Sequence, residues 1–164
     1  MYIAQIRAYD VANGPGIRST LFVSGCTHNC KGCFNREAQN FKYGTLYDKS
    51  IEEQYILNCK NDRVVGVSIL GGEPMEQGLE LLNLLKRIKE EVRKPIWLWS
   101  GYTYEEIIAD PIKKSILECV DVLIDGKFIE EQKDLMLLYR GSKNQRVINV
   151  KESLETGNIV QNIL

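Results

Sequence analysis

The chain has 164 residues and a formal net charge of −1, with 44% hydrophobic and 26% charged residues. This length and composition predict one soluble globular domain spanning residues 1–164. A charge so close to zero gives no electrostatic support for a nucleic-acid partner. No apolar run reaches the roughly 18 residues of a membrane span, so we expect no membrane partner.

Segments with strand and helix character alternate along the chain. In chain order, the expected elements are a strand at 19–23, a helix at 50–60, a strand at 64–70, a helix at 76–93, a strand at 95–100, helices at 103–108 and 112–120, and strands at 121–126 and 145–150. The helices at 50–60 and 103–108 each open with an apparent capping box, Ser50 with Glu53 and Thr103 with Glu106. Such alternation predicts an α/β fold, an open partial (β/α) barrel of about five to six parallel strands, because a closed barrel typically needs ~250 residues.

Unusual loops follow four of the expected strands. The cysteine-rich stretch follows 19–23, "GGEP" follows 64–70, "SGY" follows 95–100 and "DGK" follows the strand that begins at 121. The carboxyl ends of parallel strands meet on one side of the sheet, so we expect these loops to form one working face.

The overall cysteine usage indicates a reducing compartment. The chain has five cysteines, and its first ten residues lack the basic and apolar regions of a signal peptide. An odd cysteine count without an export signal disfavours a disulfide framework, so we expect a cytoplasmic protein. Cys59 and Cys119 fall in expected helices, where they read as ordinary core residues.

The other three cysteines form a metal-ligand pattern. Cys26, Cys30 and Cys33 have the spacing C-x3-C-x2-C, and clustered thiolates suit zinc or an iron–sulfur cluster. Zinc needs a fourth ligand, which His28 could supply. A 4Fe–4S cluster held by three cysteines instead leaves one iron open to a small molecule. The spacing favours the cluster, and three unligated buried cysteines remain the plainest alternative.

These motifs carry a family resemblance. C-x3-C-x2-C after an early strand, with Gly-Gly-Glu after a later one, resembles the radical S-adenosylmethionine superfamily. Within it, the chain resembles the family that activates anaerobic ribonucleoside-triphosphate reductase, a group of glycyl-radical-activating enzymes. This narrower resemblance extends from Tyr2 to about Val150 and is carried by Asn13–Asn35, Trp97–Thr103, Asp121–Phe128 and Arg140–Ile148.

The resemblance implies a single radical S-adenosylmethionine domain and a specific chemistry. Cys26, Cys30 and Cys33 would ligate a 4Fe–4S cluster, and S-adenosylmethionine would chelate the open iron. Reductive cleavage would give a 5′-deoxyadenosyl radical, which would generate a glycyl radical on the large subunit of the reductase. The resemblance also implies an electron donor such as flavodoxin. It makes the protein an oxidoreductase whose hard chemistry belongs to the cofactors, with no catalytic side chain.

Further site residues follow from the resemblance and from the residue types. Paired glycines let a backbone approach a ligand closely, and an adjacent acid adds a compensating charge. An aromatic residue that often precedes the third cysteine in the superfamily is replaced here by a glycine, and a phenylalanine follows that cysteine instead. The expected cofactor-binding residues are Gly32, Phe34, Gly71, Gly72, Glu73, Pro74, Ser100, Tyr102, Asp125 and Lys127. Those expected to contact the substrate protein are Asn13, Gly14, Arg140, Asn144 and Arg146, of which the last three could instead anchor the methionine carboxylate.

Other functions remain open at this stage. Another radical S-adenosylmethionine activase, such as one for pyruvate formate-lyase, would share the cysteine motif. An enzyme acting on a small molecule would usually need further barrel units to enclose its substrate. A zinc-bound interaction module would use the cysteines without catalysis.

Overall fold

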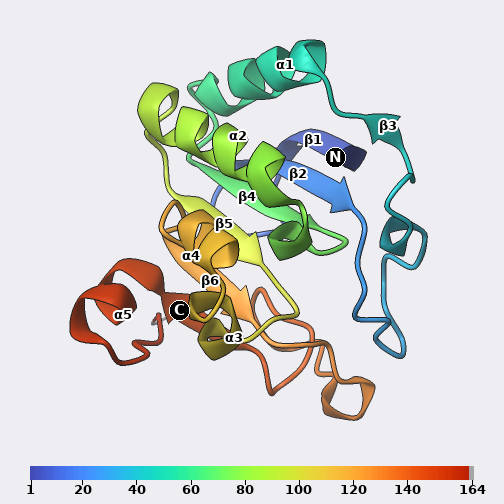
Figure 1. Ribbon diagram of the computed structural model, residues 1–164, viewed down its shortest axis with the longest axis vertical. Coiled ribbons are helices and arrows are strands. Elements are labelled where there is room, and N and C mark those ends of the chain that lie inside the picture. The colour runs from blue at the N-terminus through green and yellow to red at the C-terminus, as the bar shows by residue number, and fades with distance from the viewer. Residues whose placement is uncertain (163–164) are drawn as a thin grey trace.

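The computed structural model describes residues 1–162, which form a mixed sheet with helices packed on one face (Figure 1). The strands are β1 (Tyr2–Asp10), β2 (Arg18–Ser24), β3 (Thr45–Leu46), β4 (Gly66–Gly71), β5 (Ile96–Trp99), β6 (Val122–Asp125) and β7 (Arg146–Asn149). The helices are α1 (Lys49–Lys60), α2 (Gly78–Glu91), α3 (Tyr104–Ile108), α4 (Pro111–Leu117) and α5 (Val150–Thr156), with short 3₁₀ turns η1 (Glu37–Gln39), η2 (Pro74–Glu76) and η3 (Glu130–Gln132). The expected strands and helices are present, whereas β1, β3 and α5 were not foreseen.

The expected partial barrel of five to six parallel strands is wrong. The described residues form a seven-stranded sheet in the order β3-β1-β2-β4-β5-β6-β7. Parallel pairing is confined to β2–β4, β4–β5 and β5–β6 among these strands. The edge pairs β1–β2, β1–β3 and β6–β7 are antiparallel. A short turn joins β1 to β2, and no α-helix crosses over between β6 and β7, so neither connection returns the chain in a parallel direction.

Helix starts agree with the sequence in one case and differ in another. Thr103 and Glu106 form the predicted capping box at the start of α3. The capping box predicted at Ser50 is wrong, because Asp48 is the N-cap of α1 and accepts a hydrogen bond from the backbone of Ile51. The ambiguity arises because both Asp48 and Ser50 are residue types favoured at N-caps.

The assignment of residues 1–164 to a single domain stays a prediction.

The two faces of the sheet carry different side chains because successive residues of a strand point in opposite directions. On β5, Ile96 and Leu98 join the main core under the helices, while Trp97 belongs to a smaller cluster on the opposite face. Figure 1 shows α2 and α4 lying across the first of these faces. Within residues 1–162, the second face carries no α-helix; the segment after β6 packs against it through Tyr139.

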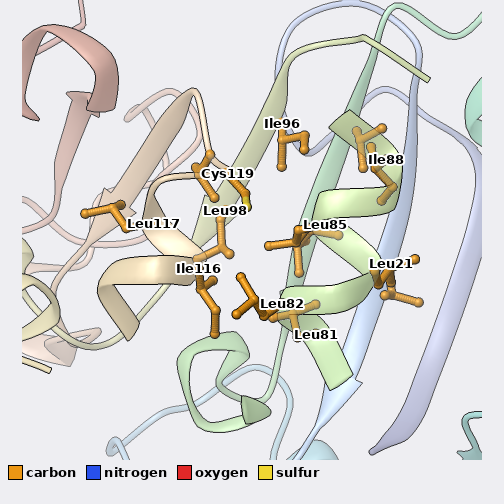
Figure 2. Close-up of a cluster of buried hydrophobic side chains, with 14 of the residues drawn as sticks. Leu21, Leu81, Leu82, Leu85, Ile88, Ile96, Leu98, Ile116, Leu117 and Cys119 are labelled. Atoms are coloured by element: carbon orange, nitrogen blue, oxygen red, sulfur yellow. The ribbon is translucent and has the colours of Figure 1, made fainter. Parts of the chain in front are cut away.

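The main core depends on the apolar stripe of α2. Leu81, Leu82, Leu85 and Ile88 are buried, and Figure 2 shows them grouped with side chains of β2, β5 and α4. Their spacing places them on one side of the helix, which explains why α2 lies flat on the sheet. Within the described residues, no helix combines the length and hydropathy needed to cross a bilayer.

The turn between β1 and β2 is organised by the buried carboxylate of Asp10. Its oxygens accept hydrogen bonds from the backbone of Ala12 (2.9 Å), the side chain of Asn13 (2.7 Å) and the hydroxyl of Thr20 (2.7 Å). The carbonyl oxygen of Asn13 in turn accepts from the hydroxyl of Ser68 at 2.6 Å. These contacts hold the turn against the helix-free face of the sheet.

Asp10→Asn should lower the free energy of unfolding and make that free energy less dependent on pH in the acid range. Burial alone would raise the pKa of Asp10, but the hydrogen bonds from Asn13, Ala12 and Thr20 outweigh it and hold the pKa below the usual value. A carboxylate with a lowered pKa stabilises the fold above the unfolded pKa of about 3.9, and this contribution disappears as pH falls through the folded pKa. We expect a loss of about 1–3 kcal/mol in unfolding free energy at pH 7, measured by urea denaturation.

The same titration should be repeated between about pH 6 and pH 3, where the wild type should lose more stability than Asp10→Asn. The exposed Asp62 provides the matched control, Asp62→Asn, which should behave like the wild type. Parallel pH profiles for the wild type and Asp10→Asn would contradict the role of Asp10.

Candidate functional site

A cavity of about 670 Å³ opens where β2, β4 and β5 end, on the helix-free face of the sheet. Its walls come from the turn after β1, the cysteine loop after β2, Gly71–Gly72 at the end of β4, Trp99–Gly101 at the end of β5, and the segment between β6 and β7. The sequence predicted that loops would converge at the ends of the parallel strands. The structure has this convergence, although the sheet is not a partial barrel.

The cysteine loop brings its three thiols to this cavity. Cys26, Cys30 and Cys33 are all free, partly buried and part of the cavity wall. The loop begins where the backbone N–H groups of Gly25 and Cys26 donate to the carbonyls of Ala38 and Gln39, at 2.7 and 3.1 Å. The structure therefore places together the three residues that the spacing singled out.

The spread of the thiols fits a multi-metal cluster better than a single ion. Four ligands at Zn–S distances of about 2.3 Å would bring the sulfurs within ~4 Å of one another. Among the described residues, the one group of three potential ligand atoms lying within 4.8 Å of one another is Cys26 with His28 and Glu76, and not the three cysteines. A cluster with several metal atoms takes thiolates that are further apart, so the donor set suits an iron–sulfur centre.

Metal binding at this loop has to displace protons. Burial raises the pKa of the Cys26 thiol to about 11, with Glu73, Glu76 and Cys30 adding to the shift. Burial also raises the pKa of Cys30. These two thiols are therefore protonated at neutral pH in the metal-free protein, and a metal that binds them as thiolates must release those protons.

The two glycines after β4 are required by chain packing as well as by any ligand. A Cβ at Gly72 would lie 2.8 Å from the carbonyl oxygens of both Val23 and Gly25. A Cβ at Gly71 would collide with the same carbonyl of Val23, and Gly71 has a φ of 159°. Both glycines line the cavity, and the carbonyl of Gly71 already accepts a hydrogen bond from the side chain of Asn35 at 3.2 Å.

Glu73 lies inside the protein rather than on the cavity wall. Its side chain is fully buried and accepts from the hydroxyl of Ser100 and from the backbone of Gly101 (2.7 Å) and Met75 (2.9 Å). His28 Nε2 lies 2.7 Å from the same carboxylate. The acid that was expected to bind the cofactor through its compensating charge is thus surrounded by donors of its own chain.

The predicted site residues divide between the cavity and its supports. Those that line the cavity are Asn13, Cys26, Cys30, Cys33, Phe34, Gly71, Gly72, Ser100 and Arg140. Those outside its wall are Gly14, Gly32, Glu73, Pro74, Tyr102, Asp125, Lys127, Asn144 and Arg146.

Several residues outside the wall brace the segment that follows β6. Asp125 is buried and pairs with Arg146 at the β6–β7 edge, and Arg146 also pairs with Glu105 at 2.8 Å. The side chain of Asn144 donates to the backbone carbonyl of Lys127 at 2.7 Å, while the lysine side chain is exposed. These polar groups serve the fold, since their partners lie within the chain.

The remaining residues outside the wall also have partners within the chain. The ring of Tyr102 meets the edge of His28 with centroids 4.5 Å apart, and its hydroxyl lies 3.3 Å from Glu76. Pro74 is buried at the first turn of η2. Gly14 and Gly32 have φ values of 112° and 76°, so they permit turns that other residues rarely adopt.

Sequence reasoning missed part of the cavity wall. Trp99 lines it and donates from Nε1 to the carbonyl of Tyr139 at 2.6 Å. Its place at the carboxyl end of a parallel strand could have revealed it. Gln145 also lines it, accepting from the backbone of Gly141 (2.8 Å) and donating to that of Gly126 (2.9 Å). No local pattern in the sequence indicated these hydrogen bonds of the Gln145 side chain. His28, which the sequence offered only as a fourth zinc ligand, lines the cavity as well. The other lining residues that were missed are Ala12, Asn35, Leu70, Gly101, Gly126, Phe128, Asp134, Leu135, Leu137, Tyr139 and Gly141.

Comparison with known proteins agrees with this donor set. Residues 12–148 match the family described as "4Fe-4S single cluster domain". This description favours the iron–sulfur alternative over zinc.

The chain is also similar to whole proteins of one name, anaerobic ribonucleoside-triphosphate reductase-activating protein. It is 46% identical over 147 residues to that of Haemophilus influenzae and 39% identical over 147 residues to that of Escherichia coli K12; both alignments cover 87% of this chain and 94% of the relative. The protein of that name from enterobacteria phage T4 is 38% identical over 141 residues, covering 84% of this chain and 87% of the relative. On this similarity, the chain belongs to the family of anaerobic ribonucleoside-triphosphate reductase-activating proteins.

Proposed function

We propose that this protein activates an anaerobic ribonucleoside-triphosphate reductase and that Cys26, Cys30 and Cys33 hold a 4Fe–4S cluster for that purpose. The observation that carries the proposal is the convergence of these three thiols, spaced as C-x3-C-x2-C, on one cavity at the ends of the parallel strands. The names of the relatives supply the partner, and the family description supplies the type of cluster.

With S-adenosylmethionine also bound, such a cluster would supply one electron to cleave the sulfonium into methionine and a 5′-deoxyadenosyl radical. That radical would take a hydrogen atom from a glycine of the reductase, leaving 5′-deoxyadenosine and a glycyl radical. Three protein thiolates leave one metal position without a protein ligand, which is where a small molecule can bind. A flavodoxin-like electron donor and a cytoplasmic location complete the proposal.

The residues of the chain provide binding and shielding around that position. Gly71 and Gly72 line the cavity with backbone alone, and a carbonyl oxygen has two lone pairs, so the Gly71 carbonyl can accept from an ammonium group beside its bond from Asn35. Arg140 also lines the cavity, and its buried Nε has no hydrogen-bond partner among the described residues, which suits a carboxylate. Leu70, Trp99 and Phe128 form apolar walls that exclude water from the reacting groups.

The cavity is bordered by exposed apolar side chains that suit a protein substrate. Leu135, Met136 and Leu138, here called the apolar rim, are 84%, 89% and 56% exposed, and Leu135 also lines the cavity. Water-exposed apolar groups of this size beside a site are typical of surfaces that a partner covers. We therefore assign the apolar rim to contact with the reductase.

Hydrogen bonds hold both ends of the segment that carries the apolar rim. The backbone of Asp134 donates to the carbonyl of Gly141 at 3.2 Å, and Lys133 and Ser142 form a β-bridge just below. At the other end, Trp99 anchors the carbonyl of Tyr139. A rim held at both ends loses little conformational entropy when a partner binds.

Cys30→Ala should remove the cluster while leaving the fold intact. The variant lacks one of three metal ligands, so anaerobic reconstitution should give little iron and sulfide, and co-incubation with reductase, S-adenosylmethionine and a reductant should give no glycyl doublet in electron paramagnetic resonance. Cys119→Ala is the matched control, because Cys119 is buried away from the cavity. A wild-type protein that takes up iron yet never yields the doublet would sink the proposed activity.

Met136→Lys combined with Leu138→Lys should separate the partner from the chemistry. Neither side chain lines the cavity, so cleavage of S-adenosylmethionine without the reductase should stay within about twofold of the wild type. Lysines on the apolar rim should reduce reductase activation and reductase binding by at least about tenfold, since each apolar side chain that is buried contributes roughly 1.5–3 kcal/mol.

The control is Leu57→Lys combined with Leu79→Lys, which places the same charges on exposed positions of α1 and α2. Equal activation by the two double variants would show that the apolar rim does not meet the reductase.

A further inference from the structure

We propose that His28 and Glu73 are positioning residues, whose side-chain contact fixes the cysteine loop against the ends of β4 and β5. The contact joins His28 Nε2 to Glu73 Oε1 at 2.7 Å. His28 lies between two of the cysteines, so whatever holds it also holds the course of the loop. The inference rests on the proposed function, in which that loop carries the cluster.

The carboxylate of Glu73 acts as a junction between separate segments. Oε1 accepts from His28 of the cysteine loop and from the backbone of Gly101 after β5, while Oε2 accepts from Met75 of its own turn. The hydroxyl of Ser100 lies 3.0 and 2.9 Å from the two oxygens. A buried carboxylate without such donors would be strongly unfavourable, so each donor is held in place in turn.

The backbone of Glu73 and the residues that follow it also hold the cysteine loop through hydrogen bonds. Its N–H donates to the carbonyl of Gly25 at 2.7 Å, at the start of the cysteine loop. The hydroxyl of Thr27 donates to Glu76 at 2.7 Å, and the side-chain amide of Gln77 donates to the carbonyl of Ser24 at 3.0 Å. The segment that begins with the two glycines therefore clamps the first half of the loop at several points.

The surroundings of His28 are shaped to hold its ring. Both partners of the contact are almost fully buried, with side-chain exposures of 6% and 1%. Tyr102 packs against the ring edge, and a Cβ at Gly101 would lie 2.6 Å from His28 Cδ2, so only glycine leaves room there. Because a carboxylate only accepts, Nε2 carries the hydrogen of this bond. That nitrogen is therefore engaged with Glu73 and is not a metal ligand.

The turn beyond His28 explains why the loop needs such a hold. Asn29 has a φ of 52°, a left-handed conformation that asparagine tolerates but that is uncommon outside glycine. This turn redirects the chain between Cys26 and Cys30, both of which reach the cavity wall. With the ring of His28 anchored on one side of the turn, the two thiols keep a defined separation.

The test uses three variants that differ in what they leave at the junction. His28→Ala removes the donor, whereas His28→Gln keeps an N–H donor at a similar reach. Glu73→Gln replaces one accepting oxygen by an amide that faces other donors. Glu90→Gln on α2 is the matched control, since its side chain is exposed and makes no hydrogen bond or ion pair within residues 1–162.

The first readout is amide hydrogen exchange in the cluster-free protein under anaerobic conditions. His28→Ala and Glu73→Gln should speed exchange across residues 25–34 by at least about tenfold, because the loop opens locally. His28→Gln and Glu90→Gln should match the wild type. The second readout is iron and sulfide content after reconstitution, with the electron paramagnetic resonance spectrum of the reduced protein. His28→Ala and Glu73→Gln should alter that spectrum. His28→Gln should give the spectrum of the wild type.

Three outcomes decide between positioning and its alternatives. Loss of iron in His28→Gln as severe as in His28→Ala would make His28 a ligand and overturn the proposal. Lower thermal stability in His28→Ala, with unchanged exchange at residues 25–34 and an unchanged spectrum, would also overturn it. A wild type that binds no iron, with the exchange differences intact, would uphold the contact and sink the proposed function instead.

Discussion

The burial of one carboxylate organises the working end of this protein. Glu73 sits fully inside the chain, where its charge is tolerated only because donors from three segments converge on it. Those segments are the cysteine loop, the turn after β4 and the turn after β5. Losing any one donor leaves the others facing an undersatisfied acid, so the three turns are coupled in position. The cavity lies directly beside this junction, so the positions of its walls depend on these hydrogen bonds.

The sheet supplies the second condition. Because β2, β4, β5 and β6 are parallel, their carboxyl ends lie side by side, and loops that are far apart in the sequence meet there. Helices cover one face of the sheet, so the cavity occupies the other face, between the turn after β1 and the segment after β6. The antiparallel edges limit this arrangement on both sides. The result is an open site bordered by the apolar rim, which is consistent with a substrate presented by another protein.

Prediction from sequence worked best where the signal was local. The apolar runs located the parallel strands, and the apolar stripe of Leu81, Leu85 and Ile88 located α2, because burial imposes a period of two or 3.6 residues on the chain. The direction of β7 could not be read in this way. Its residues have strand character in either direction, and only the connection from β6 decides how the strand returns. β1 was missed because half-buried residues alternate with exposed ones over most of its length, leaving no continuous apolar run.

The spacing of Cys26, Cys30 and Cys33 and the pair Gly71–Gly72 were enough to identify the centre of the site, since both patterns are short and are set by local chain geometry. Whether a polar side chain faces the cavity or the protein interior was decided only by the tertiary structure. Glu73 and Asp125 both follow or end a parallel strand, and both turn inward to donors contributed by distant segments. A hydrogen-bond partner tens of residues away leaves no local mark on the sequence. For that reason the sequence alone singled out the three clustered cysteines, while the packed fold determined which neighbouring residues support their loop.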